Sequence, residues 1–347
     1  MSAPLVITQD PHLHDQVSRL AAAAGVEISV QPDVGASLGD WAAAALVLVG
    51  ADCADSLAAL LPPRREGAYV VCEGPAPHQL FEQALRLGAE SVVSLPTSQT
   101  WLVEVLTDAG DLAPTRGRTI SVIGGAGGAG STTFACALGQ VLARQSSVLM
   151  LDADPQGPGL DRVLGMEDLA GVRWDSLMHT TGRLSARSLA DAVPRRRGLG
   201  VVTWPAGARG ALPVFGFREV LSAGVRGHGH VVIDLPRAPG PLAQEAFVRS
   251  DHLVMVVSAS LTGLASAAQV AARLPAGTDT GLVVRGEAFT AAEVTAAVGL
   301  PVWAMMRDQR GLTEAIDLGL GPVRGRRGAL TAASREVLDG LALREAA

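Results

Sequence analysis

The chain has 347 residues, of which 48% are hydrophobic and 18% are charged, and this composition is typical of a globular protein with room for two domains. All 28 cationic side chains are arginine, because the sequence contains no lysine. Schiff-base chemistry and a lysine in a phosphate-binding loop are therefore excluded. The net charge of −6 and an aromatic content of only 3% argue against a protein that binds nucleic acid over its whole surface.

The compartment is indicated by three features of the sequence. The cysteines, Cys53, Cys72 and Cys136, have no CxxC spacing, which argues against a zinc site and a disulfide framework. Residues 1–15 lack the basic and then apolar pattern of a secretory signal. The most apolar window, residues 42–61, is interrupted by two aspartates and does not predict a membrane span. We therefore expect a cytoplasmic protein.

The N-terminal part of the chain alternates short apolar runs with helix-like runs. This alternation predicts a parallel sheet covered by helices on both faces, as in flavodoxin-like domains. The polar Gly- and Pro-containing segment 111–118 is predicted to be a linker, so that the domains comprise residues 1–110 and 119–347. The expected N-terminal strands are 4–10, 26–32, 45–52, 68–74 and 91–96, and the expected helices are 14–25, 78–88 and 100–110.

A second alternation follows the linker and predicts a larger, doubly wound α/β domain with a mostly parallel sheet. Ligands in such sheets bind beyond the carboxyl ends of the strands. The final segment, residues 331–347, is amphipathic with mixed charge, which favours packing on the protein's own sheet over a membrane surface. The seven expected strands are 119–124, 147–154, 198–207, 230–236, 252–260, 281–286 and 301–306.

Residues 124–133 read Gly-Gly-Ala-Gly-Gly-Ala-Gly-Ser-Thr-Thr, between an expected strand and an expected helix. Glycines allow consecutive backbone N–H groups to turn inward, and the helix N-terminus adds partial positive charge, so the loop is suited to a phosphate group. A tight turn that binds nothing is the alternative. The predicted phosphate-binding residues are Gly127, Gly128, Ala129, Gly130, Ser131, Thr132 and Thr133.

Acidic residues follow two of the other expected strands. Asp152 and Asp154 end one strand, and Asp234 ends a later one. P-loop proteins hold Mg²⁺ and position a water with carboxylates at such strand ends, so we predict that Asp152 and Asp234 bind nucleotide and, with Thr132, a Mg²⁺ ion. Asp154 is the candidate catalytic residue. An aspartate that only caps the next helix is the alternative.

The segments GAGGAGSTT, LDADPQGPGLD, VVIDLP and MMRDQRGLTEAIDLG resemble, in order and spacing, the deviant Walker A ATPases of the MinD/ParA superfamily, over residues 118–345. With a receiver-like domain in front, the chain is similar to the CpaE/TadZ-like branch, which includes actinobacterial septum-site-determining proteins. The resemblance implies ATP or ADP with Mg²⁺, a homodimer, protein partners in cell division or pilus assembly, and a position in the cytoplasm or at the membrane, pole or septum.

The sequence departs from this superfamily at the positions that matter for hydrolysis. The family pattern K-G-G-x-G-K-T-T falls on residues 126–133, where Ala126 and Ser131 replace the two lysines. Arg285 replaces the asparagine often found on the adenine side. We therefore expect a degenerate ATPase with weak or no hydrolysis. A protein that binds no nucleotide at all is the alternative. The alternatives are a genuine slow ATPase and a DNA-associated partitioning protein using the arginines of segments 194–198 and 324–327, although DNA is not favoured.

The N-terminal domain resembles a response-regulator receiver in which the phosphorylation site is altered. Gly50 occupies the place of the phosphoryl-accepting aspartate, and Asp52 follows two residues later. Leu95 occupies the place of the receiver lysine, and only Asp10 matches the acidic Mg²⁺ pocket. We predict a pseudo-receiver that docks partners and is not phosphorylated.

Overall fold

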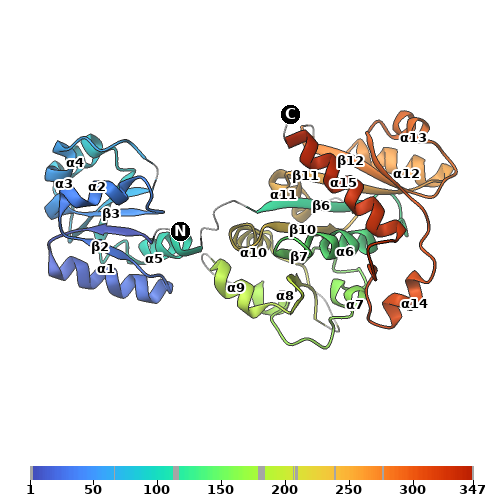
Figure 1. The fold of residues 1–347 in the computed structure, drawn as a ribbon, viewed down its shortest axis with the longest axis horizontal. Coiled ribbons are helices and arrows are strands. Elements are labelled where there is room, and N and C mark those ends of the chain that lie inside the picture. Colours follow the sequence, from blue (N-terminus) through green and yellow to red (C-terminus); the bar gives the residue numbers. More distant parts are fainter. Residues whose placement is uncertain are drawn as a thin grey trace. The chain divides into compact units, whose positions relative to one another are not determined.

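A computed structural model describes residues 3–65, 67–111, 117–178, 184–205, 207, 210–237, 240–275 and 277–345. The chain divides into two compact units, residues 1–114 and 115–347 (Figure 1). Helix α5 ends at Asp111 and strand β6 begins at Arg118. Most of the predicted linker 111–118, namely residues 112–116, lies outside the described residues.

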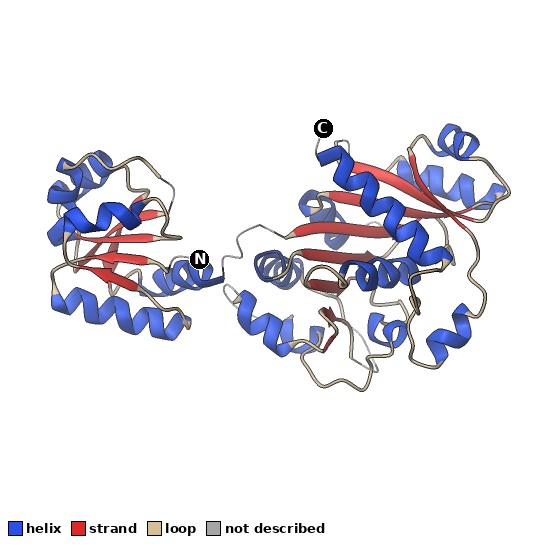
Figure 2. Cartoon of the chain, viewed as in Figure 1, coloured by secondary structure: helices blue, strands red, loops and turns tan. Residues whose placement is uncertain are grey.

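The first unit is built on a parallel sheet in the order β2-β1-β3-β4-β5, so the predicted flavodoxin-like arrangement is confirmed. Helices α2, α3 and α4 pack on one face of this sheet, and α1 and α5 pack on the other (Figure 2). Its strands are β1 (Leu5–Ile7), β2 (Ser29–Gln31), β3 (Val47–Gly50), β4 (Ala68–Glu73) and β5 (Ser91–Leu95), and its helices are α1 (Pro11–Ala24), α2 (Val34–Trp41), α3 (Ala51–Ala59), α4 (His78–Leu87) and α5 (Gln99–Asp111).

The second unit is built on a sheet that has eight strands within the described residues, in the order β13-β12-β11-β6-β10-β7-β9-β8. All neighbouring strands are parallel except β8 and β9, so the predicted mostly parallel sheet is confirmed. The strands are β6 (Arg118–Gly124), β7 (Val148–Asp152), β8 (Arg195–Arg196), β9 (Leu199–Val202), β10 (His230–Leu235), β11 (His252–Ser258), β12 (Asp279–Arg285) and β13 (Val302–Met306).

The helices of this unit cover both faces of the sheet, as the near-continuous apolar strands require. One apolar core lies under α6, α7 and α15, and a second lies under α10, α11, α12 and α13 (Figure 1). The helices are α6 (Ser131–Leu142), α7 (Leu160–Leu164), α8 (Trp174–Leu177), α9 (Ala186–Ala192), α10 (Val214–Gly227), α11 (Pro241–Arg249), α12 (Leu261–Ala271), α13 (Ala291–Val298), α14 (Leu312–Asp317) and α15 (Ala329–Glu345).

The C-terminal helix α15 packs against α6 and β13. Leu330, Val337 and Leu341 lie in the core, so its apolar face is covered by the protein itself, as its mixed charge predicted. Within the described residues, no helix is both long enough and apolar enough to cross a membrane.

The arginine-rich segment 194–198 differs from its sequence-based interpretation. Seven strands were predicted in this domain, and none of them included Arg195 or Arg196. The structure instead forms the additional strand β8 from Arg195 and Arg196, paired with Gly200 and Leu199. Two exposed arginines carry no apolar alternation, so the local pattern did not predict a strand here.

Candidate functional site

The glycine-rich loop connects the end of β6 to the start of α6 at the carboxyl edge of the sheet. Within the described part of the chain, the N–H groups of Gly127, Gly128 and Gly130 have no hydrogen-bond partner. The first N–H groups of α6, beginning at Ser131, are likewise not satisfied within the helix. Free N–H donors at a helix N-terminus are suited to an anion, so the loop has the donors that a phosphate group would need.

Two positions of the loop require glycine for distinct reasons. Gly130 is the N-cap of α6 and has φ +95°, a conformation in which a Cβ is strained. At Gly125, a Cβ would lie 2.8 Å from the Cβ of Ala267, because helix α12 packs closely there. Ser266 of the same helix donates to the Gly125 carbonyl at 2.7 Å. The loop shape is therefore fixed from two sides.

The predicted carboxylates Asp152 and Asp234 are neighbours in register on strands β7 and β10. Both are buried, with exposed fractions of 1% and 2%. Asp152 accepts hydrogen bonds from the Thr203 hydroxyl at 2.6 Å and from the Leu160 N–H at 3.2 Å. Burial raises the pKa of Asp152 to about 6, although these hydrogen bonds oppose the rise.

Asp234 has fewer partners than Asp152. The Thr132 hydroxyl lowers the pKa of its carboxyl group, but Oδ1 of Asp234 is buried with no hydrogen-bond partner. Burial, and then the negative charge of Asp152, raise the pKa of Asp234 well above its ordinary value. A buried carboxylate oxygen left free beside a second carboxylate is suited to a cation.

The residues present fit a Mg²⁺ ion of the kind that accompanies a nucleotide. Mg²⁺ takes oxygen ligands and is commonly held by one or two carboxylates together with phosphate, and Thr132, Asp152 and Asp234 supply such oxygens. In the described residues there is no cluster of three or more His, Cys, Asp or Glu side chains able to hold a metal by themselves. Thr132, Asp152 and Asp234 are therefore oxygen ligands of the type that Mg²⁺ takes together with phosphate.

Asp154 lies two residues beyond the end of β7 and is half-buried. Its Oδ1 accepts the Gln156 N–H at 2.9 Å, and its own N–H donates to Asp152 Oδ1 at 3.2 Å. Asp154 also contributes to the negative potential at Asp152 and Asp234. The three predicted carboxylates thus gather at one edge of the sheet.

Arg285, at the end of β12, reaches the glycine loop. Its Nη1 donates to the Gly128 carbonyl at 3.2 Å, and its Nε donates to Asp308 at 2.7 Å. A cavity of about 590 Å³ opens beside it, lined also by Gly130, Thr133 and Gln309. This volume lies within the range of small-ligand sites, so the structure provides space for a nucleoside next to the phosphate loop.

The structure also identifies site residues that the sequence did not. Thr203 and Asp308 were not predicted, and Arg285 was identified only as a replacement, without its contact to the loop. Ser131, in the place of the phosphate-binding lysine, has its hydroxyl oxygen close to Gly124, where a Cβ would lie 3.1 Å from it. Thr203 and Asp308 follow strands β9 and β13, and their position after a strand was the only signal available.

In the N-terminal unit, Asp52 occupies the space that a side chain on Gly50 would need. Its Oδ1 accepts the Thr8 hydroxyl at 2.9 Å, and its Oδ2 accepts the Gln9 N–H at 2.6 Å. Burial raises the pKa of Asp52, but these hydrogen bonds outweigh burial and hold the pKa below its ordinary value. Asp10 caps helix α1 by accepting the His12 N–H at 2.8 Å.

We predict that the N-terminal unit does not accept a phosphoryl group from acetyl phosphate. The Asp52 carboxylate is held by hydrogen bonds, and the buried Leu95 offers no charge to neutralise an acyl phosphate. Intact mass after incubation with the donor is the measurement. A stoichiometric adduct that disappears in Asp52→Asn would identify Asp52 as an acceptor and contradict the prediction.

Comparisons with known proteins agree with this geometry. Residues 120–316 match the CobQ/CobB/MinD/ParA nucleotide binding domain, and residues 7–117 match the Rv3660c-like, CheY-like N-terminal domain. The chain therefore belongs to the CobQ/CobB/MinD/ParA nucleotide-binding family. Protein Rv3660c of Mycobacterium tuberculosis strain H37Rv is 36% identical to it over 339 residues, which are 95% of each chain.

Three solved structures share the fold of the second unit. The ParA family ATPase of Chlorobium tepidum is 14% identical, with 64% of this chain and 98% of that chain covered and a TM-score of 0.57. The septum site-determining protein MinD of Pyrococcus horikoshii, complexed with Mg-ADP, is 20% identical, with 65% and 95% covered and a TM-score of 0.54. The MinC:MinD cell division complex of Aquifex aeolicus is 17% identical, with 65% and 95% covered and a TM-score of 0.54.

Proposed function

We propose that this protein is a nucleotide-binding regulator of the MinD/ParA type that hydrolyses ATP slowly or not at all. It acts as a CpaE/TadZ-like organiser of septum placement or of a pilus machine, in the cytoplasm and at the membrane, pole or septum. The observation that carries the proposal is the free N–H groups of the loop beside the buried pair Asp152 and Asp234, in a chain without lysine.

Binding of nucleotide is supported by three separate elements. The loop donates to phosphate through N–H groups such as those of Gly127 and Gly128. Thr132, Asp152 and Asp234 would hold Mg²⁺, which supplies positive charge to the phosphates when it is bound. The cavity bordered by Gly130 and Arg285 would take the nucleoside.

Weak hydrolysis is supported by the positions of the cations. Ser131 offers a hydroxyl and no charge where the family has a lysine, and Ala126 offers an apolar methyl group. Arg285 stands on the cavity side of the loop, engaged by Gly128 and Asp308. Loss of one donor that stabilises a transition state reduces the rate by about a hundredfold or more, so the site is suited to a binding switch.

The test is a steady-state ATP turnover assay on the full chain with Mg²⁺. We expect turnover that is indistinguishable from that of Asp154→Ala, because no ammonium group balances the charge of the β- and γ-phosphates. Robust turnover that is abolished by Asp154→Ala would contradict the proposal and establish a genuine ATPase.

Action through protein partners is supported by exposed apolar side chains on both units. On α4, Phe81 and Leu85 are 49% and 72% exposed at i, i+4 spacing and therefore lie on one helical face. On the second unit, Leu261 is 77% exposed at the start of α12, the helix whose Ser266 contacts the glycine loop. We propose that Phe81 and Leu85 contact a partner of the division or pilus machinery and that Leu261 lies in the interface of a homodimer.

A further inference from the structure

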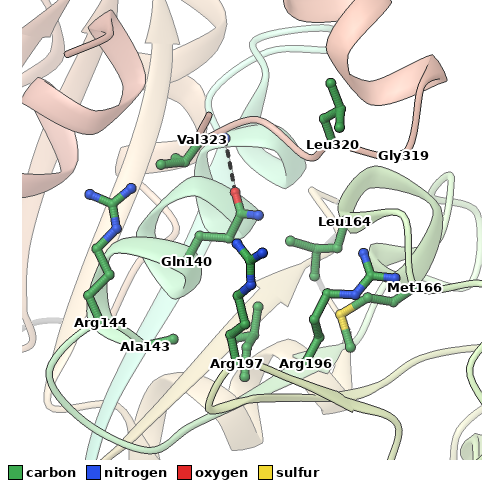
Figure 3. A pocket seen from close by; sticks show the side chains of 11 residues that line it. Gln140, Ala143, Arg144, Leu164, Met166, Arg196, Arg197, Gly319, Leu320 and Val323 are labelled. Atoms are coloured by element: carbon green, nitrogen blue, oxygen red, sulfur yellow. Dashed lines mark hydrogen bonds between the residues drawn. The ribbon is translucent and has the colours of Figure 1, made fainter. Parts of the chain in front are cut away.

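A second cavity, of about 460 Å³, lies at the opposite edge of the same sheet (Figure 3). Arg144 follows the end of helix α6, and Leu199 begins strand β9. Because the glycine loop precedes α6, the length of this helix, roughly 18 Å at 1.5 Å per residue, separates the two sites. The cavity is therefore independent of the proposed nucleotide site.

The cavity combines positive charge with an apolar wall. Arg144, Arg196 and Arg197 line it, and none of the described residues that line it is acidic. In Figure 3 the side chain of Arg197 extends toward Gln140, and that of Arg196 extends toward Met166 and Leu164. The apolar wall is formed by Leu164, Met166, Leu199, Leu320 and Val323.

Neighbouring contacts hold parts of the cavity in place. The Gln140 amide oxygen accepts the Val323 N–H at 2.9 Å (Figure 3), which orients the Gln140 amide group at the cavity wall. Arg144 donates to the Gly325 carbonyl at 3.0 Å. This bond brings the arginine-rich segment 324–327 next to the cavity, so two basic segments that are distant in the sequence meet on this part of the domain.

The backbone of Arg197 is a separate observation. Arg197 and Gly198 form the two-residue connection between β8 and β9, with φ of +51° and +82°. Positive φ at both positions is the signature of a type I′ hairpin turn, which favours Asn, Asp or Gly. An arginine is strained in this conformation, and strained residues cluster where a side chain is needed for function. The strain at Arg197 therefore indicates a function for its guanidinium group.

We propose that this cavity binds a small organic phosphate. Its phosphate pairs with the guanidinium groups of Arg196 and Arg197, and its apolar part lies against Leu164, Met166 and Leu320. Guanidinium groups form bidentate hydrogen bonds with phosphate, and several cations without a carboxylate match a group that carries close to two negative charges. The volume is that of a small-molecule site.

The test uses phenyl phosphate as the probe, titrated calorimetrically into the full chain. Arg197→Gly is expected to weaken binding about tenfold or more, because a charge-assisted hydrogen bond is lost. The same change relieves the positive φ, so the thermal midpoint should stay the same or rise. A loss of affinity without a loss of stability therefore separates binding from misfolding.

The matched control is Arg195→Gln. Arg195 lies in the same exposed hairpin, but its side chain donates to the Ala190 carbonyl at 3.3 Å and does not line the cavity. We expect its affinity for phenyl phosphate to stay within about threefold of the wild-type value. Absence of binding at millimolar probe, or equal binding by wild type and Arg197→Gly, overturns the proposal.

Two further arms identify the source of the phosphate. Sedimentation with phosphatidic acid vesicles, but not with phosphatidylcholine vesicles, that is lost in Arg197→Gly supports the site and assigns the phosphate to a lipid headgroup. Failure to sediment, with phenyl phosphate still bound, supports a free ligand. Binding of duplex DNA that falls equally in Arg195→Gln and Arg197→Gly, without binding of phenyl phosphate, overturns the proposal, because it reports only the charge of the hairpin.

Discussion

Gly130→Val is expected to abolish binding of Mg-ADP to the full chain. The N-cap position has φ +95°, and a β-branched residue there is strained by about 1–3 kcal/mol. The new Cβ would also lie 3.5 Å from Nη1 of Arg285, in the space between the loop and the nucleoside cavity. Without the lysine charge, we expect wild-type affinity in the micromolar to millimolar range, about −8 to −4 kcal/mol, so the variant should show no binding at millimolar nucleotide.

Gly299→Val is the matched control for the strain itself. Gly299 caps the C-terminal end of α13 with φ +81°, and a Cβ added there would have open space around it. The substitution therefore imposes similar backbone strain away from the glycine loop, and it should lower stability while leaving Mg-ADP affinity unchanged. Calorimetric titration of the three proteins is the measurement. If wild type and Gly130→Val both fail to bind, the loop is only a turn, and if both bind equally, the argument from loop geometry is wrong.

Much of the fold follows from the sequence because parallel strands buried on both faces are continuous apolar runs. Helices α2 and α3 were not predicted. Helix α3 begins at Ala51, directly after β3 ends at Gly50, so one apolar window contains a strand and a helix without a boundary signal. Strand β8 was not predicted because it has no apolar pattern. Its pairing depends on the turn at Arg197 and Gly198.

The part of the candidate site that lies at the carboxyl ends of the strands was predictable from the sequence. Asp152, Asp154 and Asp234 were identified because acidic residues at carboxyl ends of strands meet at one edge of a parallel sheet. Their individual environments were not predictable, since Thr203, whose hydroxyl donates to Asp152, lies directly after a different strand, β9. The bond from Arg285 to the Gly128 carbonyl depends on side-chain conformation, which no motif specifies.

Asp234→Asn is expected to stabilise the protein at pH 8. In the fold, burial and the charge of Asp152 raise the pKa of Asp234, so its protonated form is favoured. A raised folded pKa contributes stability that is present below the ordinary value near 3.8 and is lost as pH rises through the folded pKa. The wild type should therefore lose stability between pH 5 and pH 8. The variant carries no charge at position 234 and should therefore be more stable than the wild type at pH 8.

Urea unfolding at both pH values measures this difference, with Asp168→Asn as the control. Asp168 is exposed, so removal of its charge should change the free energy of unfolding by no more than about 0.5 kcal/mol at either pH. If the destabilising Asp234 carboxylate is kept because it binds Mg²⁺, a second result follows. Mg²⁺ should strengthen ADP binding to the wild type and not to Asp234→Asn, because the unpartnered Oδ1 is lost as an anionic ligand. A variant that is less stable than the wild type at pH 8 would show that Asp234 supports the fold and would remove it from the Mg²⁺ site.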